Sequence, residues 1–140
     1  MLKTTYDDIW TSFLENCKLN SEDIPQSEEM IYSCISNAVN IYNQKAKKYN
    51  NRMQIIECNE TMEEVSVKLT TDELLILSNI IAGVVCRNSL LQFSSLYGTY
   101  AKEMGISNIK AQTDARRLNA EYFEQKTQSL IEDLVDTFDL

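Results

Sequence analysis

Four cysteines are the side chains of this sequence best suited to nucleophilic or metal chemistry, and they lie far apart at positions 17, 34, 58 and 86. No CxxC pair occurs, and the chain has no histidine to complete the common zinc sites or to activate a nucleophile. Histidine is also the side chain best placed to shuttle protons near neutral pH. We therefore expect free, mostly buried thiols in a reducing cytosol, with no catalytic site and no metal site.

Carboxylates are the next candidates for catalysis. Adjacent acids such as Asp7 and Asp8, or Glu28 and Glu29, point in different directions on a helix, so they do not form a convergent pair. The phosphate-binding patterns GxGxxG and GxxxxGKS are absent, as is an EF-hand loop, so no cofactor is expected. A carboxylate-based enzyme stays open only if the fold has a deep pocket lined by convergent acids.

The formal net charge of −8 disfavours tight binding to nucleic acid, because an acidic surface repels phosphate. The charge alternates along the chain: residues 31–56 carry +4 and 74–120 carry +3, whereas 1–30, 57–73 and 121–140 each carry −5. Such alternation suits neighbouring copies that meet through opposite patches, and solvated helix faces are the alternative explanation. No run of about 18 apolar residues suggests a membrane span.

The chain has only three glycines and one proline, which leaves little turn chemistry for a multi-stranded sheet and favours helices. We predict a mainly α fold: a small helical bundle that forms one domain over residues 1–140, with a long C-terminal helix. The helices are expected at about residues 5–18, 27–49, 71–87 and 107–138, with a helical loop over 88–105.

Helix starts are marked by capping residues. Thr5 precedes Asp8 by three residues, Ser27 precedes two glutamates, and Thr70 precedes Glu73 by three residues. The helix after Thr70 is apolar nearly all round, so it is expected to be central, and Gly83 within it suggests a close helix crossing.

Residues 54–69 break the helical pattern. Val65, Val67 and Leu69 alternate with polar residues, which indicates a strand, so we predict a short β-hairpin or extended arm. Unpaired backbone groups at such an edge are a natural place for a neighbouring subunit to add a strand.

The last helix would be about 45 Å long, more than a domain of this size needs, so one end is expected to project. Arg116 and Arg117 lie near its start, where the helix dipole disfavours positive charge. Two interpretations stay open for them, a salt bridge to an acidic neighbour or solvent exposure.

The order of these elements resembles the small helical neck proteins of tailed bacteriophages, known as head–tail connectors, adaptors or head-completion proteins. The resemblance begins with a helix containing Tyr6-Asp7-Asp8-Ile9-Trp10 and a second helix containing Ala38 and Ile41. It continues with Leu69-Thr70-Thr71-Asp72-Glu73-Leu74 before the apolar helix, then a polar and aromatic bridge and a long last helix. The strand-like stretch 65–69 departs from a minimal all-helical adaptor.

The resemblance implies a structural virion protein, assembled in the bacterial host cytoplasm, that forms a homo-oligomeric ring of about twelve copies in the virion neck. Its partners would be the portal protein and a tail-side neck or tail-completion protein. DNA would pass through without tight binding, and no membrane would be involved. The alternative is a small cytosolic helical regulator or assembly chaperone that binds one protein partner.

Two segments are predicted to contact partners in this interpretation. The arm would contact a neighbouring ring subunit or the tail-side protein, the two arginines would form polar contacts, and the end of the last helix would dock on the portal. The predicted interface residues are Ile55, Ile56, Val65, Val67, Arg116, Arg117, Leu134, Val135, Phe138 and Leu140.

Overall fold

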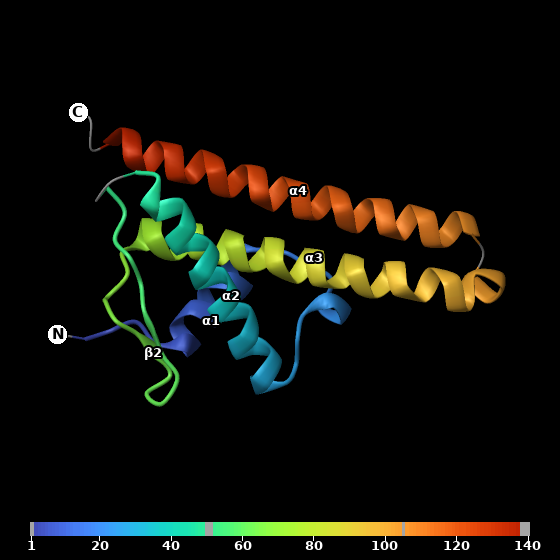
Figure 1. Cartoon of the computed structure of the whole chain (residues 1–140), viewed down its shortest axis with the longest axis horizontal. Coiled ribbons are helices and arrows are strands. Elements are labelled where there is room, and N and C mark those ends of the chain that lie inside the picture. The colour runs from blue at the N-terminus through green and yellow to red at the C-terminus, as the bar shows by residue number, and fades with distance from the viewer. Residues whose placement is uncertain (1, 50–51, 105, 138–140) are drawn as a thin grey trace.

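The computed structural model describes the backbone of residues 2–49, 52–104 and 106–137, and the side chains of residues 2–49, 52–95 and 108–136. The fold is mainly helical with a small two-stranded sheet and a long C-terminal helix, as predicted (Figure 1). In chain order the elements are α1 (Tyr6–Asn16), the 3-10 turn η1 (Ser21–Asp23), α2 (Glu28–Lys47), β1 (Cys58–Asn59), β2 (Glu64–Val65), α3 (Thr71–Met104) and α4 (Ile106–Thr137).

The predicted caps are confirmed at three helix starts. Thr5 and Asp8 form a reciprocal capping box before α1, and the Ser27 hydroxyl accepts from a backbone N–H in the first turn of α2. Thr70 and Glu73 exchange the same pair of hydrogen bonds before α3. These bonds satisfy backbone donors that a helix start leaves free, so local capping residues determine where these three helices begin.

α3 is the central helix. α1 and α2 pack on its first half, and α4 runs antiparallel along it (Figure 1). Residues 71–95 are long and apolar enough to cross a membrane by length and composition, but 61% of the apolar stretch is buried inside the fold. Packing against three helices therefore accounts for its apolar character. Its core residues are Ile76, Leu77, Ile80, Ile81, Ala82, Val85 and Cys86.

The predicted end of this helix near Arg87 is wrong, because α3 continues without a break to Met104. The predicted helical loop over 88–105 is therefore the second half of one helix, with residue 105 outside the described residues. α4 supplies the reason: Ser89 is buried against it, so tertiary packing stabilises a stretch whose own sequence pattern is weak.

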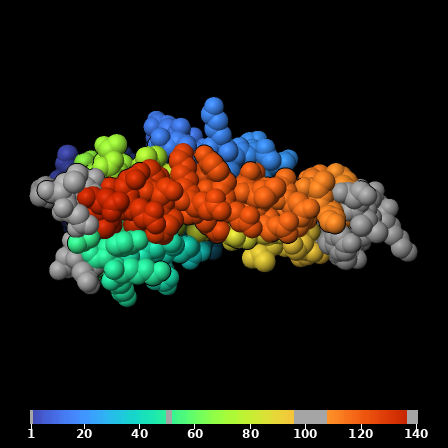
Figure 2. All heavy atoms as spheres, turned by 90° about the horizontal axis from the view of Figure 1, so that it is seen from above, coloured from blue at the N-terminus to red at the C-terminus, as the bar shows by residue number. Residues whose placement is uncertain are grey.

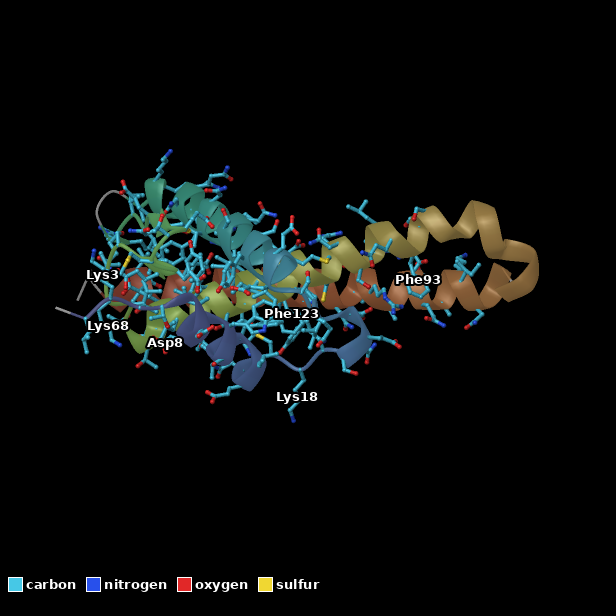
Figure 3. All side chains as sticks on the ribbon, turned by 90° about the horizontal axis from the view of Figure 1, so that it is seen from below. Lys3, Asp8, Lys18, Lys68, Phe93 and Phe123 are labelled. Atoms are coloured by element: carbon cyan, nitrogen blue, oxygen red, sulfur yellow. The ribbon has the colours of Figure 1, made fainter. Side chains whose placement is uncertain are left out.

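The second half of α3 and the first half of α4 form a helical hairpin that projects beyond the body built by the other elements (Figures 1 and 2). Phe93 lies on this projecting part, whereas Phe123 lies in the body (Figure 3). The expected projection of the last helix is thus found at its N-terminal half. Its C-terminal half lies on the body, where Ile131 and Val135 are buried.

The arm predicted over 54–69 contains the two-stranded sheet. β1 and β2 are antiparallel, with Cys58 opposite Val65, and an isolated bridge adds Thr5 on the other side of Glu64. Glu63, in the turn, has a left-handed φ of 54°. The two-stranded sheet is therefore packed on the start of α1. This contact compensates for the low stability that an isolated hairpin has in water.

Candidate functional site

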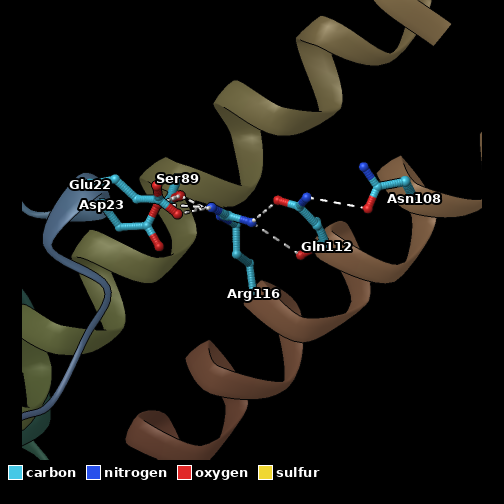
Figure 4. A network of polar contacts seen from close by, with 6 residues as sticks. All are labelled: Glu22, Asp23, Ser89, Asn108, Gln112 and Arg116. Carbon is cyan, nitrogen blue, oxygen red and sulfur yellow. Dashed lines mark hydrogen bonds and ion pairs between the residues drawn. The ribbon is translucent and has the colours of Figure 1, made fainter. Parts of the chain in front are cut away.

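Arg116 is the centre of a buried polar cluster at the point where the hairpin leaves the body (Figure 4). Its Nη2 lies 3.1 Å from an Asp23 carboxylate oxygen and 3.7 Å from a Glu22 oxygen, and its Nε donates to the Ser89 hydroxyl at 2.8 Å. Ser89 in turn bonds Asp23 at 2.8 Å. We call the cluster of Arg116, Asp23, Glu22, Ser89 and Gln112 the arginine junction. The structure therefore supports the first of the two interpretations of Arg116, a salt bridge to an acidic neighbour, and not solvent exposure.

The remaining donors of Arg116 are also satisfied. Nη1 lies 3.4 Å from the backbone carbonyl of Gln112 and 3.3 Å from its side-chain oxygen, and the guanidinium carbon stands 3.8 Å above the Phe93 ring. Arg116 is 6% exposed, and a buried charge is tolerated only when it is paired in this way. The arginine junction joins η1, α3 and α4, so it fixes the hairpin on the body.

Glu73 organises a second buried cluster at the start of α3. Besides capping the helix, its carboxylate accepts from the Tyr42 hydroxyl at 3.4 Å and from the Gln54 amide at 2.9 Å. Burial and the neighbouring Glu73 charge raise the pKa of Tyr42 well above its usual value. The cluster therefore connects α2, the arm and α3, and its role is to stabilise the fold.

The backbone of the arm is paired within the chain. Asn43 on α2 both accepts from the Ile56 N–H at 2.9 Å and donates to the Ile56 carbonyl at 2.8 Å, as a strand partner would. On the other side, Thr4 accepts from the Val65 N–H at 2.9 Å and its hydroxyl accepts from the Leu69 N–H. The backbone groups on which the strand-addition idea depended are thus occupied at these positions.

The predicted interface residues fall into three groups. The first group belongs to the core and comprises Ile56, Val65, Arg116 and Val135. The second group is half-buried and comprises Val67 and Leu134. The third group is exposed and comprises Ile55 and Arg117, while Phe138 and Leu140 lie outside the described residues. Arg117 pairs with Asp114 on its own helix at 2.8 Å.

The C-terminal part of α4 does not project, which corrects the argument behind the predicted docking segment. Val135 is buried and Leu134 packs against the same core. The physical reason is that the apolar residues at this end are required to cover the first half of α3. Removal of this end of α4 would therefore disturb the core.

An apolar stripe on α4 is exposed to solvent. Leu118 and Tyr122 are 60% and 56% exposed, and Ala111 and Ala115 are exposed on the same face of α4. Their spacing of four, three and four residues places them opposite the buried face that contains Ala120 and Phe123. The sequence carried the signal, since α4 has two apolar registers and only one of them can face α3.

A groove of about 610 Å³ runs over α3 between α2 and α4. Ile41, Ile80, Gly83 and Val84 give it an apolar floor, and Arg87 pairs with Glu124 at 2.7 Å across its edge. Its lining holds a single carboxylate, so this groove is not the pocket of convergent acids that a carboxylate enzyme needs.

The cysteines are free, as predicted, and three of the four are buried. Burial raises the pKa of Cys17 and of Cys86 to about 11 in each case. These thiols are protonated at neutral pH and therefore poor nucleophiles. No group of three or more metal-ligating side chains occurs among the residues that the structure describes.

The sequence model of the YomZ prophage protein family matches residues 1–136 of this chain. The chain belongs to this family. It is also 32% identical over 126 residues to the SPbeta prophage-derived uncharacterized protein YomZ of Bacillus subtilis (strain 168), a match that covers 89% of each chain. No solved structure matches the chain.

Membership of the YomZ family confirms the expected bacteriophage origin. The match covers the body and the projecting hairpin together, so the two are parts of one family fold.

Proposed function

We propose that this YomZ-family chain is a structural virion protein: a head-to-tail connector or adaptor subunit that forms a ring between portal and tail and surrounds the DNA passage. The observation that carries the proposal is the helical hairpin that projects from the body and is joined to it by the arginine junction. A projection on a small body gives a subunit two separate places for contact, which a protein that links two assemblies requires.

The surface of the chain supports a role in protein contacts. The apolar stripe on α4 is exposed to solvent, and exposed apolar stretches on helices are typical of interaction sites. The net charge of −8 favours passage of DNA without tight binding, since negative surfaces repel the phosphate backbone. The expected partners are further copies of the chain, the portal protein and a tail-side neck protein, at the neck of the virion.

The proposal is tested on particles produced by induction of the prophage. Mass spectrometry of purified particles should find the chain, and deletion of its gene should leave DNA-filled heads separated from tails in electron micrographs. Complementation with the intact gene is the control. A chain that is required for assembly but absent from purified particles would contradict the proposal and favour the cytosolic assembly chaperone or regulator instead.

A further inference from the structure

We infer that the outer face of α4 docks along α2 and the adjoining groove of a second copy of this chain, with the apolar stripe in the groove and the acidic end of α4 on the α2 lysines. The inference names the contact between subunits in the proposed ring and takes its biological setting from that proposed function. Two complementary surfaces on one chain, the outer face of α4 and the α2 face with its groove, support this contact.

The docking face of α4 changes character along the helix. Its first part is the apolar stripe, in which Leu118 and Tyr122 give the largest exposed side chains. Further along, Glu132 and Asp136 are exposed on the same face. Negative charge near a helix C-terminus opposes the helix dipole, so the interaction of these acids with the dipole is unfavourable for α4.

The receiving face of α2 has the opposite charge character. Residues 31–56 contain no aspartate or glutamate, although the whole chain has 21 of them. From residue 37 to the C-cap, the exposed side chains of α2 are amides followed by lysines: Asn37, Asn40, Gln44, Lys47 and Lys48. Such a face offers hydrogen-bond donors and positive charge to an acidic helix end.

The groove beside α2 receives the apolar part. Ile41 and Val84 are only half-buried in the subunit and lie in the groove floor beside Gly83, which has no side chain to fill the space. A tyrosine that enters such a groove brings a large rigid area and a hydroxyl for the amides at the rim, Asn37 among them.

The two surfaces match in spacing and direction. Glu132 lies about 15 Å beyond Tyr122 along α4, and Lys47 lies about 15 Å beyond Asn37 along α2, at about 1.5 Å per residue. The incoming α4 must therefore run in the same direction as the receiving α2. Within one subunit α2 and α4 reach the same end of the molecule, where the Gln128 amide donates to the Tyr49 hydroxyl.

A contact between α4 of one subunit and α2 of the next is heterologous when each pair of copies makes it once, and isologous when two copies make it reciprocally. The proposed ring requires the heterologous form. Contacts of this kind close into rings when the rotation between copies allows it. Glu132 accepts a hydrogen bond from the Gln128 amide at 3.2 Å. None of the ion pairs within the described part of the chain uses Lys47, Lys48, Glu132 or Asp136, so those ion pairs leave the four charges for a neighbour. The apolar stripe supplies most of the affinity, and the charges set the register.

Site-specific cross-linking tests the contact. A photoreactive benzoylphenylalanine replaces Tyr122, and cross-linked peptides are mapped by mass spectrometry in the purified chain at high concentration and in purified particles. We expect the probe to capture residues 37–45 or 80–88 of another copy. Capture elsewhere, or no cross-link between copies in either preparation, overturns the inference. If particles lack the chain, the proposed function fails while the purified chain still decides the contact.

Charge reversal and rescue provide a second test. The variants Lys47→Glu with Lys48→Glu, and Glu132→Lys with Asp136→Lys, should each lower the cross-linking yield about tenfold at low salt, where charge pairs act most strongly. Combining all four substitutions should restore the yield. Lys3→Glu with Lys18→Glu is the matched control, because both lysines are exposed on the side of the body seen in Figure 3 and outside the contact. Failure of the combined variant to recover, with circular dichroism showing intact folding, overturns the inference.

Discussion

Arg116 on α4 and Asp23 in η1 are 93 residues apart in the sequence and form a buried ion pair at 3.1 Å. The pair joins the hairpin to the segment that leads from α1 to α2. Its position at the edge of the body means that the projecting part cannot change its angle without separating buried charges, which is costly in a low-dielectric environment.

Replacing Arg116 with methionine should lower the free energy of unfolding by about 3 kcal/mol, because the Asp23 carboxylate loses its buried partner. Urea unfolding followed by circular dichroism measures the change. The control is Arg117→Met, since Arg117 pairs with Asp114 in an exposed position and should change stability by less than about 0.5 kcal/mol. Equal losses in the two variants would contradict the role given to the arginine junction.

Glu73→Ala should cost more than Asp8→Ala, although both residues occupy the same place in a capping box. Asp8 is exposed, so its loss should cost about 0.5 kcal/mol. Glu73 is buried and also accepts from Tyr42 and Gln54, so about 2 kcal/mol should be lost. Thermal or urea unfolding of the two variants in parallel measures the difference, and a smaller loss for Glu73→Ala would disagree with the described cluster.

Gly83→Ala should stabilise the chain by up to about 1 kcal/mol. A β-carbon at this position would meet the Glu124 Cγ at 3.6 Å, an ordinary contact, and alanine restricts the unfolded chain and favours the helix. The neighbouring change Ala82→Gly, in a fully buried position, should act in the opposite direction. A melting temperature that falls for Gly83→Ala would show that the groove needs this glycine in the isolated subunit.

Alkylation of the native protein at pH 8 should modify Cys58 before Cys17 and Cys86. The pKa of about 11 leaves only about one thiol in a thousand ionised at pH 8 for each of the last two, and burial blocks access as well. Because the thiolate is the reactive form, the rate at these sites should rise as the pH rises towards the pKa. Peptide mass spectrometry with and without urea measures the order, and early modification of Cys17 would contradict the packing of α1 on α3.

The sequence was sufficient for the features that depend on neighbouring residues. The capping pairs at Thr5, Ser27 and Thr70 have a local cause, so the starts of three helices followed from short motifs. The alternation in residues 65–69 likewise predicted a strand, and the structure has one at Glu64–Val65, shorter than the pattern.

The features that depend on distant residues could not be predicted in the same way. The sequence pattern predicted that α3 ends near Arg87. In the structure the helix continues to Met104, because α4 covers a stretch with no strong pattern of its own. The choice between a buried and an exposed Arg116 depended on Asp23, which only the fold brings near. Leu118 and Tyr122 are apolar residues in a helix, and the sequence alone does not say which of two registers meets α3.

Because α4 returns antiparallel along α3, the part of α4 that covers the first half of α3 is synthesised last. The apolar first half of α3 is made early, but the residues that cover it from α4, including Phe123 and Ile131, follow only after the hairpin turn. A nascent chain therefore carries an uncovered apolar helix on the ribosome for the time needed to make the whole hairpin. Cotranslational chaperones should bind ribosome-held chains whose part outside the exit tunnel ends before residue 120 and release those whose part outside the tunnel extends past residue 135.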